Sequence, residues 1–213
     1  MKLYYSPGAC SLGIHFLLEE TGLPYEAVPV VIKQQENLTP AYAAINPKQK
    51  VPVLQRDDGS YLTEFGAICH WLSHGPAADL LAPGTLEAEV RTIEILDYIV
   101  GTIHMQGFSR ILRPQKFSPS ESDLDWVREQ GRDIVTKGFS QLSRQLGAKP
   151  FLTGDRLGIA DAAALYVLFW GIERLNMPVS ESLDAYFARL SARPAAKTVF
   201  QAEGLPLRAL RSA

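Results

Sequence analysis

The first fifteen residues of the chain constrain its fold more than any other stretch. Residues 2–5 have the composition of a β-strand, residues 6–9 break it with Pro and Gly, and an apolar run at helical spacing follows Cys10. A cysteine at a helix N-terminus meets free N–H groups and the positive end of the helix dipole. We therefore expect its pKa to lie below the ~8.5 of a free cysteine. A small, inert buried cysteine is the alternative.

Length and composition narrow the class of protein. The chain has 213 residues, of which 46% are hydrophobic and 21% charged, as in an ordinary globular protein with one large or two smaller domains. A formal net charge of −2 implies no basic surface, so we expect no nucleic-acid partner. No apolar run approaches ~20 residues and no secretory signal precedes the first strand, so we expect a cytoplasmic protein without membrane association.

The cysteines and histidines form no metal-binding pattern. Cys10 and Cys69 are too few and too far apart for a disulfide framework or a ligand cluster, so we expect no metal site. His15, His70 and His74 show no partner pattern either, and we interpret them as structural or exposed.

Residues 1–76 alternate between strand and helix patterns. We predict a helix over 11–21 ended by Gly22, a strand over 25–32 whose Pro29 indicates either an edge strand or a bulge, and a short helix begun by Thr39 and Pro40. Strands over 51–55 and 60–62 flank a hairpin turn, and Thr63 is expected to cap a helix that reaches residue 74. This βαβαββα order predicts a three-layer α/β domain.

The remainder of the chain has only helical patterns. Residues 77–84 are rich in Gly, Pro and Ala and are the predicted linker, and residues 85–213 are predicted to form an all-helical domain. Long helices are expected over 85–111 and 124–146, the second begun by a capping signal at 120–123. Residues 159–174 are apolar on nearly every side, which indicates a central buried helix. Asp161 in its first turn is interpreted as a structural cap.

Six segments in this order resemble the cytosolic glutathione S-transferases, most closely the bacterial β-class. They are MKLYYSPGACSLGIHFLLEETGLPYE, INPKQKVPVL, LTEFGAI, LLAP, GIADAAALYVLFW and ARPAAKTVFQAEGL, and they span both predicted domains. The resemblance implies a thioredoxin-like N-terminal domain that binds glutathione, a helical C-terminal domain, and a homodimer. It also implies glutathione as a co-substrate and no prosthetic group.

The resemblance implies which residues bind glutathione. Val51 matches the family residue whose main chain pairs with the cysteinyl part of the tripeptide, and Pro52 matches the family's cis-proline. Glu64 and Phe65 match the helix N-terminus that receives the γ-glutamyl group, where carboxylates are favoured. Lys33 matches lysines that contact the glycyl carboxylate, although a lone loop lysine is equally typical of a solvated surface.

The resemblance also implies the catalytic residues. His104 matches the β-class histidine near the thiol, and we expect it to hydrogen-bond the glutathione sulfur or Cys10. Ser11 is the alternative to Cys10, because other classes use a Ser or Tyr in this region to hold the thiolate. Phe108, Tyr166 and Trp170 are candidates for an apolar second-substrate pocket, although aromatic residues at helical spacing are also typical of a core.

Three positions depart from the family pattern. Phe65 stands where Ser or Gly is usual, which removes a hydroxyl and adds bulk. Gln49 replaces a common Gly, and Met105 replaces a lysine that often follows the β-class histidine. Because Met105 carries no charge, the positive field near the thiol is expected to be weaker than usual.

The sequence favours a glutathione transferase that conjugates the glutathione thiolate to small hydrophobic electrophiles. One alternative uses Cys10 in glutathione-dependent thiol–disulfide exchange or peroxide reduction. Another is a non-catalytic ligand-binding relative that keeps the fold, since a fold alone does not carry a function.

Overall fold

A computed structural model describes residues 1–207. A four-stranded sheet has the order β2-β1-β3-β4, in which β1 pairs in parallel with β2 and antiparallel with β3, and β3 pairs antiparallel with β4. The strands are β1 (Lys2–Tyr5), β2 (Glu26–Pro29), β3 (Val53–Gln55) and β4 (Tyr61–Thr63). The accompanying helices are α1 (Ser11–Thr21), α2 (Pro40–Ile45), α3 (Phe65–His74) and α4 (Ala78–Leu81).

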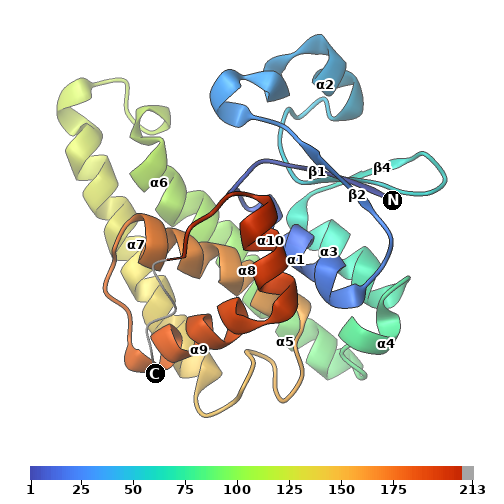
Figure 1. Cartoon of the computed structure of the whole chain (residues 1–213). Coiled ribbons are helices and arrows are strands. Elements are labelled where there is room, and N and C mark those ends of the chain that lie inside the picture. The colour runs from blue at the N-terminus through green and yellow to red at the C-terminus, as the bar shows by residue number, and fades with distance from the viewer. Residues whose placement is uncertain (208–213) are drawn as a thin grey trace.

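The sheet is the middle of three layers. Helices α1 and α3 cover one face, and α2 lies on the other (Figure 1). The α1 and α3 face belongs to the main apolar core, whereas a smaller cluster of Val30, Tyr42, Val51 and Val53 fills the side toward α2. The predicted thioredoxin-like α/β arrangement is confirmed.

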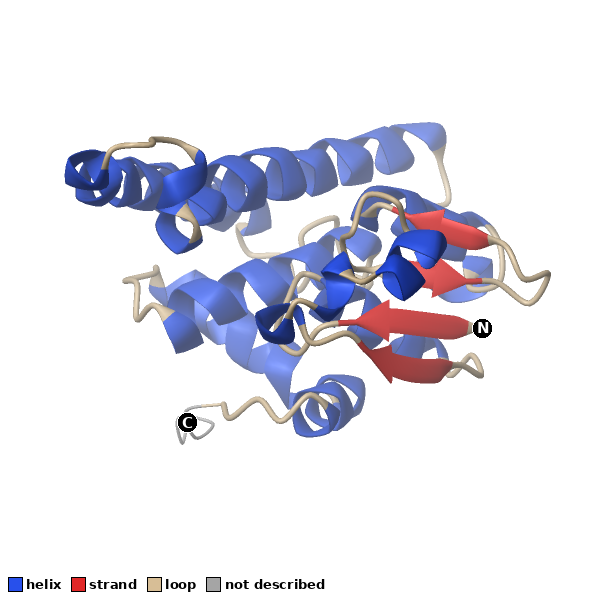
Figure 2. Ribbon diagram, turned by 90° about the horizontal axis from the view of Figure 1, so that it is seen from above, coloured by secondary structure: helices blue, strands red, loops and turns tan. Residues whose placement is uncertain are grey.

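The second part of the chain is helical. Its helices are α5 (Leu86–Asp97), α6 (Ser109–Leu112), α7 (Leu124–Leu146), α8 (Ile159–Leu168), α9 (Glu181–Ala192) and α10 (Pro194–Ala202), with π-helical segments at Tyr98–Phe108 and Phe169–Arg174. Every residue of α8 is buried, which confirms the predicted central helix. Figure 2 shows the strands gathered on one side of the molecule and these helices beside them. Within residues 1–207, no helix combines the length and apolarity needed to cross a membrane.

Several predicted element ends were right because they depend on local signals. Helix α1 spans Ser11–Thr21, and Gly22 follows it with a φ of 64°. The Thr39 hydroxyl accepts the Tyr42 N–H at 3.3 Å and caps α2, with Pro40 at its first position. Strand β2 is an edge strand, as expected from Pro29.

Two predicted helix caps were wrong, although the helices themselves were predicted correctly. Thr63 does not cap α3: it belongs to β4, opposite Val53, and the helix begins two residues later. Helix α7 has the predicted bounds, but the capping signal at 120–123 is a 3₁₀ turn at Glu121–Asp123 and no side chain caps the helix N-terminus. The predicted helix over 85–111 is confirmed as one continuous helical run over 86–112, in which residues 98–108 are π-helical.

The predicted linker also contains folded structure. Helix α4 lies within residues 77–84, and Ala77 and Leu81 are buried in the main core. The proposed division at 1–76, 77–84 and 85–213 stays a prediction.

Gly13 marks the closest approach between the N-terminal α1 and the central α8. A Cβ on Gly13 would lie 2.5 Å from the Ala162 carbonyl oxygen and 2.8 Å from the Phe65 ring. We expect Gly13→Ala to lower the free energy of unfolding by ~1–3 kcal/mol through overpacking, despite the better helix propensity of alanine. Gly101→Ala, where no heavy atom lies within 4 Å of the new Cβ, is the control and is expected to be neutral or stabilising. Equal effects of the two substitutions in urea denaturation would contradict this packing account.

Candidate functional site

Cys10 occupies the N-cap position of α1, directly after the turn that follows β1. Its thiol donates a hydrogen bond to the Val51 carbonyl oxygen at 3.5 Å. The Val51–Pro52 peptide bond is cis, as the resemblance implied. The predicted thiol and the predicted glutathione-pairing segment are therefore in direct contact.

The pKa of Cys10 differs from the sequence expectation. Burial of the thiol raises its pKa to about 12, although the Cys10 and Ser11 backbone N–H groups and the Lys50 charge lower it. The helix terminus thus acts in the predicted direction, but desolvation outweighs it. The expectation of a lowered pKa is wrong: without a ligand, Cys10 is a protonated thiol at neutral pH and a hydrogen-bond donor.

Ser11 is occupied within the same turn. It is fully buried, its hydroxyl accepts the Ser6 N–H at 3.1 Å, and it donates to the Ser6 carbonyl at 3.3 Å. These two bonds close the turn that places Cys10. They give Ser11 a structural function, which disfavours it as the alternative hydrogen-bond donor to the glutathione thiolate.

The α3 N-terminus contains the predicted glutathione residues Glu64 and Phe65. Glu64 has a φ of 71°, and its exposed carboxylate lies 2.5 Å from the Lys48 ammonium. The Phe65 ring is buried, packs edge-on against Tyr166 at 5.3 Å between ring centroids, and contacts α1 at Gly13. The bulk of Phe65 therefore fills the core between α1, α3 and α8, and its backbone N–H stays at the helix N-terminus.

His104 lies in the π-helical segment that follows α5. Its Nδ1 is 3.2 Å from the Tyr166 hydroxyl, and its ring packs edge-on against Trp170 at 4.8 Å. Burial lowers the pKa of His104 to about 4, and the Arg113 and Lys50 charges act in the same direction. His104 is therefore neutral near pH 7. Among the described residues, Nδ1 is the acceptor available to the buried Tyr166 hydroxyl, which places the remaining imidazole proton on Nε2.

The lowered pKa of His104 predicts a pH-dependent stability. Between its unfolded pKa of ~6.5 and its folded pKa of about 4, the unfolded state binds more protons. The stabilisation is thus present above pH ~6.5 and is lost as the pH falls toward 4, by ~2–3 kcal/mol. We expect this part of the urea-denaturation pH profile to be flatter in His104→Asn. An unchanged profile in the variant would contradict the lowered pKa.

The predicted pocket aromatics form one buried cluster behind His104. Phe108 and Tyr166 are fully buried and Trp170 is 5% exposed. Ring centroids lie 5.2 Å apart for Phe108 and Trp170, and 5.0 Å apart for Tyr166 and Trp170. These contacts make the cluster part of the core in this structure, and its role as a substrate surface stays a prediction.

Trp170 and Glu203 hold Gly8 in the Cys10 turn, a role that no sequence pattern indicated. The Trp170 indole donates to the Gly8 carbonyl at 2.8 Å, and the Gly8 N–H donates to Glu203 at 2.6 Å. Glu203 also lies 2.8 Å from His15 Nδ1. Two distant parts of the helical region therefore fix the turn before Cys10. No local signal identifies Glu203, because its partners lie almost 200 residues away.

Lys50 was also missed as a site residue. Its charge lowers the pKa of both Cys10 and His104, so it lies within electrostatic range of both. The Lys50 carbonyl accepts hydrogen bonds from Tyr42 at 2.8 Å and from Asn46 at 2.7 Å, which anchors the backbone before the cis bond. Its position next to the Val51–Pro52 pair was the available sequence signal. Lys33, by contrast, is exposed on the 3₁₀ turn Ile32–Gln34.

Comparison with known proteins decides the family. The glutathione S-transferase N-terminal and C-terminal domain families match residues 8–74 and 125–171. Glutathione S-transferase GstA of Escherichia coli O157:H7 is 36% identical over 211 residues, covering 96% of this chain and 100% of that protein. The chain belongs to the glutathione S-transferase family.

Solved structures of glutathione S-transferases agree with this assignment. The bacterial β-class enzyme of Sphingomonas chungbukensis has a TM-score of 0.80 and 30% identity, covering 97% of this chain and 100% of that one. A sphingomonad glutathione S-transferase solved with glutathione has a TM-score of 0.80 and 29% identity over the same shares of the two chains. The similarity to the β-class expected from the sequence is confirmed.

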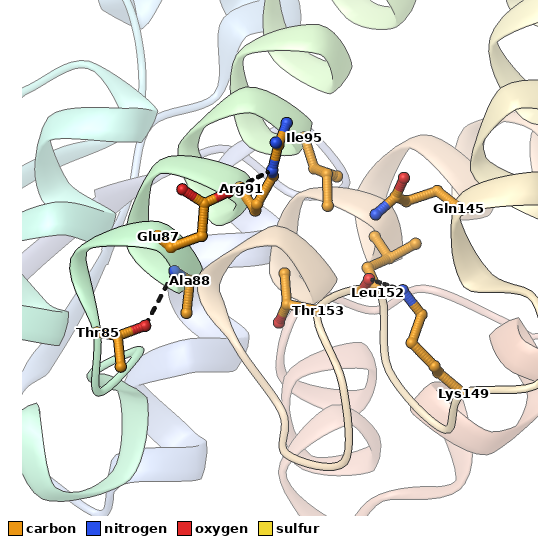
Figure 3. A pocket seen from close by; sticks show the side chains of 9 residues that line it. All are labelled: Thr85, Glu87, Ala88, Arg91, Ile95, Gln145, Lys149, Leu152 and Thr153. Atoms are coloured by element: carbon orange, nitrogen blue, oxygen red, sulfur yellow. Dashed lines mark hydrogen bonds and ion pairs between the residues drawn. The ribbon is translucent and has the colours of Figure 1, made fainter.

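A separate cavity of this glutathione S-transferase family member lies away from Cys10 (Figure 3). Its volume is about 340 Å³, and it opens between α5, the end of α7 and the loop before α8. Arg91 on its wall bonds Glu87 and Glu94, and Lys149 donates to the Leu152 carbonyl. None of the predicted glutathione residues lines it. Both of these cationic side chains are thus hydrogen-bonded to other groups of the protein.

Proposed function

We propose that the chain is a glutathione transferase that binds glutathione beside Cys10 and transfers its sulfur to a small hydrophobic electrophile. The observation that carries this proposal is the position of the Cys10 thiol, 3.5 Å from the Val51 carbonyl oxygen beside the cis Val51–Pro52 bond; the raised pKa of Cys10 supports it. A protonated thiol donates a hydrogen bond to an incoming sulfur, whereas a thiolate would repel it. The negative charge in the site then belongs to glutathione.

Glutathione binding is proposed to use backbone groups at two places. The main chain of Val51 would pair with the cysteinyl part of the tripeptide as an added strand does. The N-terminus of α3 at Glu64 and Phe65 would bind the γ-glutamyl carboxylate, and exposed Lys33 the glycyl carboxylate. The buried Phe65 ring supports this arrangement because it packs against α1 and Tyr166. A relative solved with glutathione supports the choice of tripeptide.

Three groups are proposed to stabilise the glutathione thiolate. Cys10 would donate its S–H, neutral His104 its Nε2–H, and Lys50 would contribute a positive charge within range of both. The charge of Lys50 would compensate for the absence of the family lysine at the position of Met105. In the reaction, the thiolate forms a bond to an electrophilic carbon, and the leaving group departs with the electron pair of the bond that breaks.

Thiol–disulfide exchange through Cys10 is less well supported. The attacking species in exchange is a thiolate, and a pKa of about 12 leaves few thiolates at neutral pH. A non-catalytic relative is the remaining alternative, and the departures at Phe65 and Met105 are the features that favour it.

The assembly and the location of the protein stay predictions. A homodimer is supported by exposed apolar side chains along the helix that starts with α5, where Leu86 is 75% exposed and Val90 and Met105 are also exposed. A symmetric interface would cover them. A cytoplasmic location and the absence of a prosthetic group remain expectations from the sequence.

Retention on immobilised glutathione, followed by turnover of a generic aryl halide, tests the proposal. We expect the protein to be retained and to catalyse conjugation, and Cys10→Ala to keep measurable conjugation because the reacting thiolate is that of glutathione. Intact-mass analysis after treatment with oxidised glutathione is the control for exchange. A rapidly formed adduct that Cys10→Ala abolishes, together with loss of conjugation, would favour the exchange reaction. A protein that neither binds nor turns over would contradict the transferase proposal.

A further inference from the structure

Three metal-ligating side chains meet on the surface between α3 and α5. His70 and His74 are one helical turn apart on α3 and share a face, and Glu89 comes from the first half of α5. One ligand atom from each lies within 4.8 Å of the others. The sequence predicted no metal site because the two histidines have no partner nearby in the chain. Their partner Glu89 is on α5, beyond α4.

The distances from Glu89 to the two histidines are close to those between the ligands of a tetrahedral ion. The same Glu89 carboxylate oxygen lies 3.0 Å from His74 Nε2 and 3.7 Å from His70 Nδ1. The two imidazole rings are stacked, with centroids 4.2 Å apart. Zinc binds His nitrogen and carboxylate oxygen at ~2.0–2.2 Å, so its ligand atoms lie roughly 3.3 Å from one another. Small side-chain rotations would bring the three groups to that spacing.

The other ring nitrogen of His74 is held within α3. His74 Nδ1 lies 3.1 Å from the His70 backbone carbonyl oxygen and 3.0 Å from the Ser73 hydroxyl. These contacts orient the ring so that Nε2 faces the Glu89 carboxylate at 3.0 Å. Donation from Nδ1 to a backbone carbonyl is also how metal-binding histidines are commonly oriented.

We propose that His70, His74 and Glu89 bind a divalent transition-metal ion of the zinc type. Imidazole nitrogen and carboxylate oxygen suit Zn²⁺ better than Mg²⁺ or Ca²⁺, which prefer oxygen ligands alone. The side chains are 53%, 37% and 24% exposed, so an ion reaches them from solvent and water completes its coordination. Such an ion links the helix that begins at Phe65 to the first helix after the predicted linker. The alternative is a proton on His74 Nε2, which would give a hydrogen bond or an ion pair to Glu89 without metal.

Titration calorimetry with Zn²⁺ on the untagged, chelator-treated full chain, without glutathione, tests the site. We expect one ion per chain and a raised melting temperature. Cobalt absorption spectroscopy on the same protein should show a low-coordinate Co²⁺ site. Glu89→Gln and His74→Gln are each expected to weaken Zn²⁺ binding at least about 100-fold, since each removes one of three protein ligands. Glu87→Gln removes the same charge two residues away and should leave the affinity unchanged.

Each possible result supports or overturns this site. Millimolar or weaker Zn²⁺ binding would show that His74 and Glu89 form an ion pair alone. Binding that survives both ligand substitutions would place the ion elsewhere, and equal losses in Glu87→Gln and Glu89→Gln would reduce the effect to surface charge. Circular dichroism establishes whether each variant is folded. If His74→Gln is not folded, the Zn²⁺ affinity of Glu89→Gln alone decides whether the site exists.

Discussion

Replacing Asp161 with alanine is expected to lower the free energy of unfolding by ~3–5 kcal/mol, one of the largest single-residue effects in the chain. The Asp161 carboxylate is fully buried. It accepts the Gly158 N–H at 2.7 Å and the Leu152 N–H at 2.9 Å, and the Tyr186 hydroxyl donates to it as well. The substitution leaves three buried donors without an acceptor, and each such loss costs ~1–3 kcal/mol. The lost desolvation cost of the carboxylate offsets part of that sum.

Urea denaturation measures this effect. Asp155→Ala is the matched control, because Asp155 is an exposed carboxylate in the loop before α8 and its removal should change the free energy of unfolding by no more than ~0.5 kcal/mol. If Asp161→Ala unfolds at the same urea concentration as Asp155→Ala, the buried cap does not stabilise α8. In that case the hydrogen bonds from Leu152 and Gly158 to Asp161 would not hold the 152–158 loop in place.

The second large effect concerns the reactivity of Cys10. Iodoacetamide is expected to alkylate Cys10 of the glutathione-free protein ~100-fold more slowly than a free cysteine at pH 7. Raising the pKa from ~8.5 to about 12 lowers the thiolate fraction at pH 7 ~3,000-fold. The more basic thiolate is more nucleophilic, which raises the rate constant of its reaction ~40-fold and offsets part of that loss. The rate should continue to rise up to about pH 11, without a plateau near neutral pH.

Peptide mass mapping distinguishes Cys10 from Cys69, which is fully buried and serves as the internal control. Cys69 is expected to stay unmodified until the protein unfolds. Alkylation of Cys10 at the rate of a free cysteine, or a plateau below pH 8, would show that the helix terminus outweighs burial and would restore the exchange reaction as the better proposal.

The parts of the fold that sequence predicts well are those with local causes. The left-handed Gly22 ends α1, and the Thr39–Pro40 pair begins α2. The unbroken apolar composition of α8 likewise indicates a buried helix whatever surrounds it. The cap of α3 was misassigned because Thr63 has both capping and strand propensity, and only its partner in β3 decides between them.

The site was predicted in part for the same reason. Cys10 and Val51 meet as expected, because both belong to segments with recognisable local patterns. The pKa of Cys10 was predicted with the wrong sign, since the field of a helix is readable from sequence but the depth of burial is not. Glu203 at the Gly8 turn and Glu89 beside His74 each join elements that only the tertiary fold brings together.

The central claim is that the anionic sulfur of the working site belongs to glutathione, with Cys10 as a neutral donor beside it. Ultraviolet difference spectroscopy at pH 7 measures thiolate directly in the wild-type protein and in Cys10→Ala, with and without glutathione. We predict no thiolate signal from the glutathione-free wild type and one thiolate per chain once glutathione is bound, a signal that persists in Cys10→Ala. A thiolate signal in the glutathione-free wild type that Cys10→Ala abolishes would contradict the account.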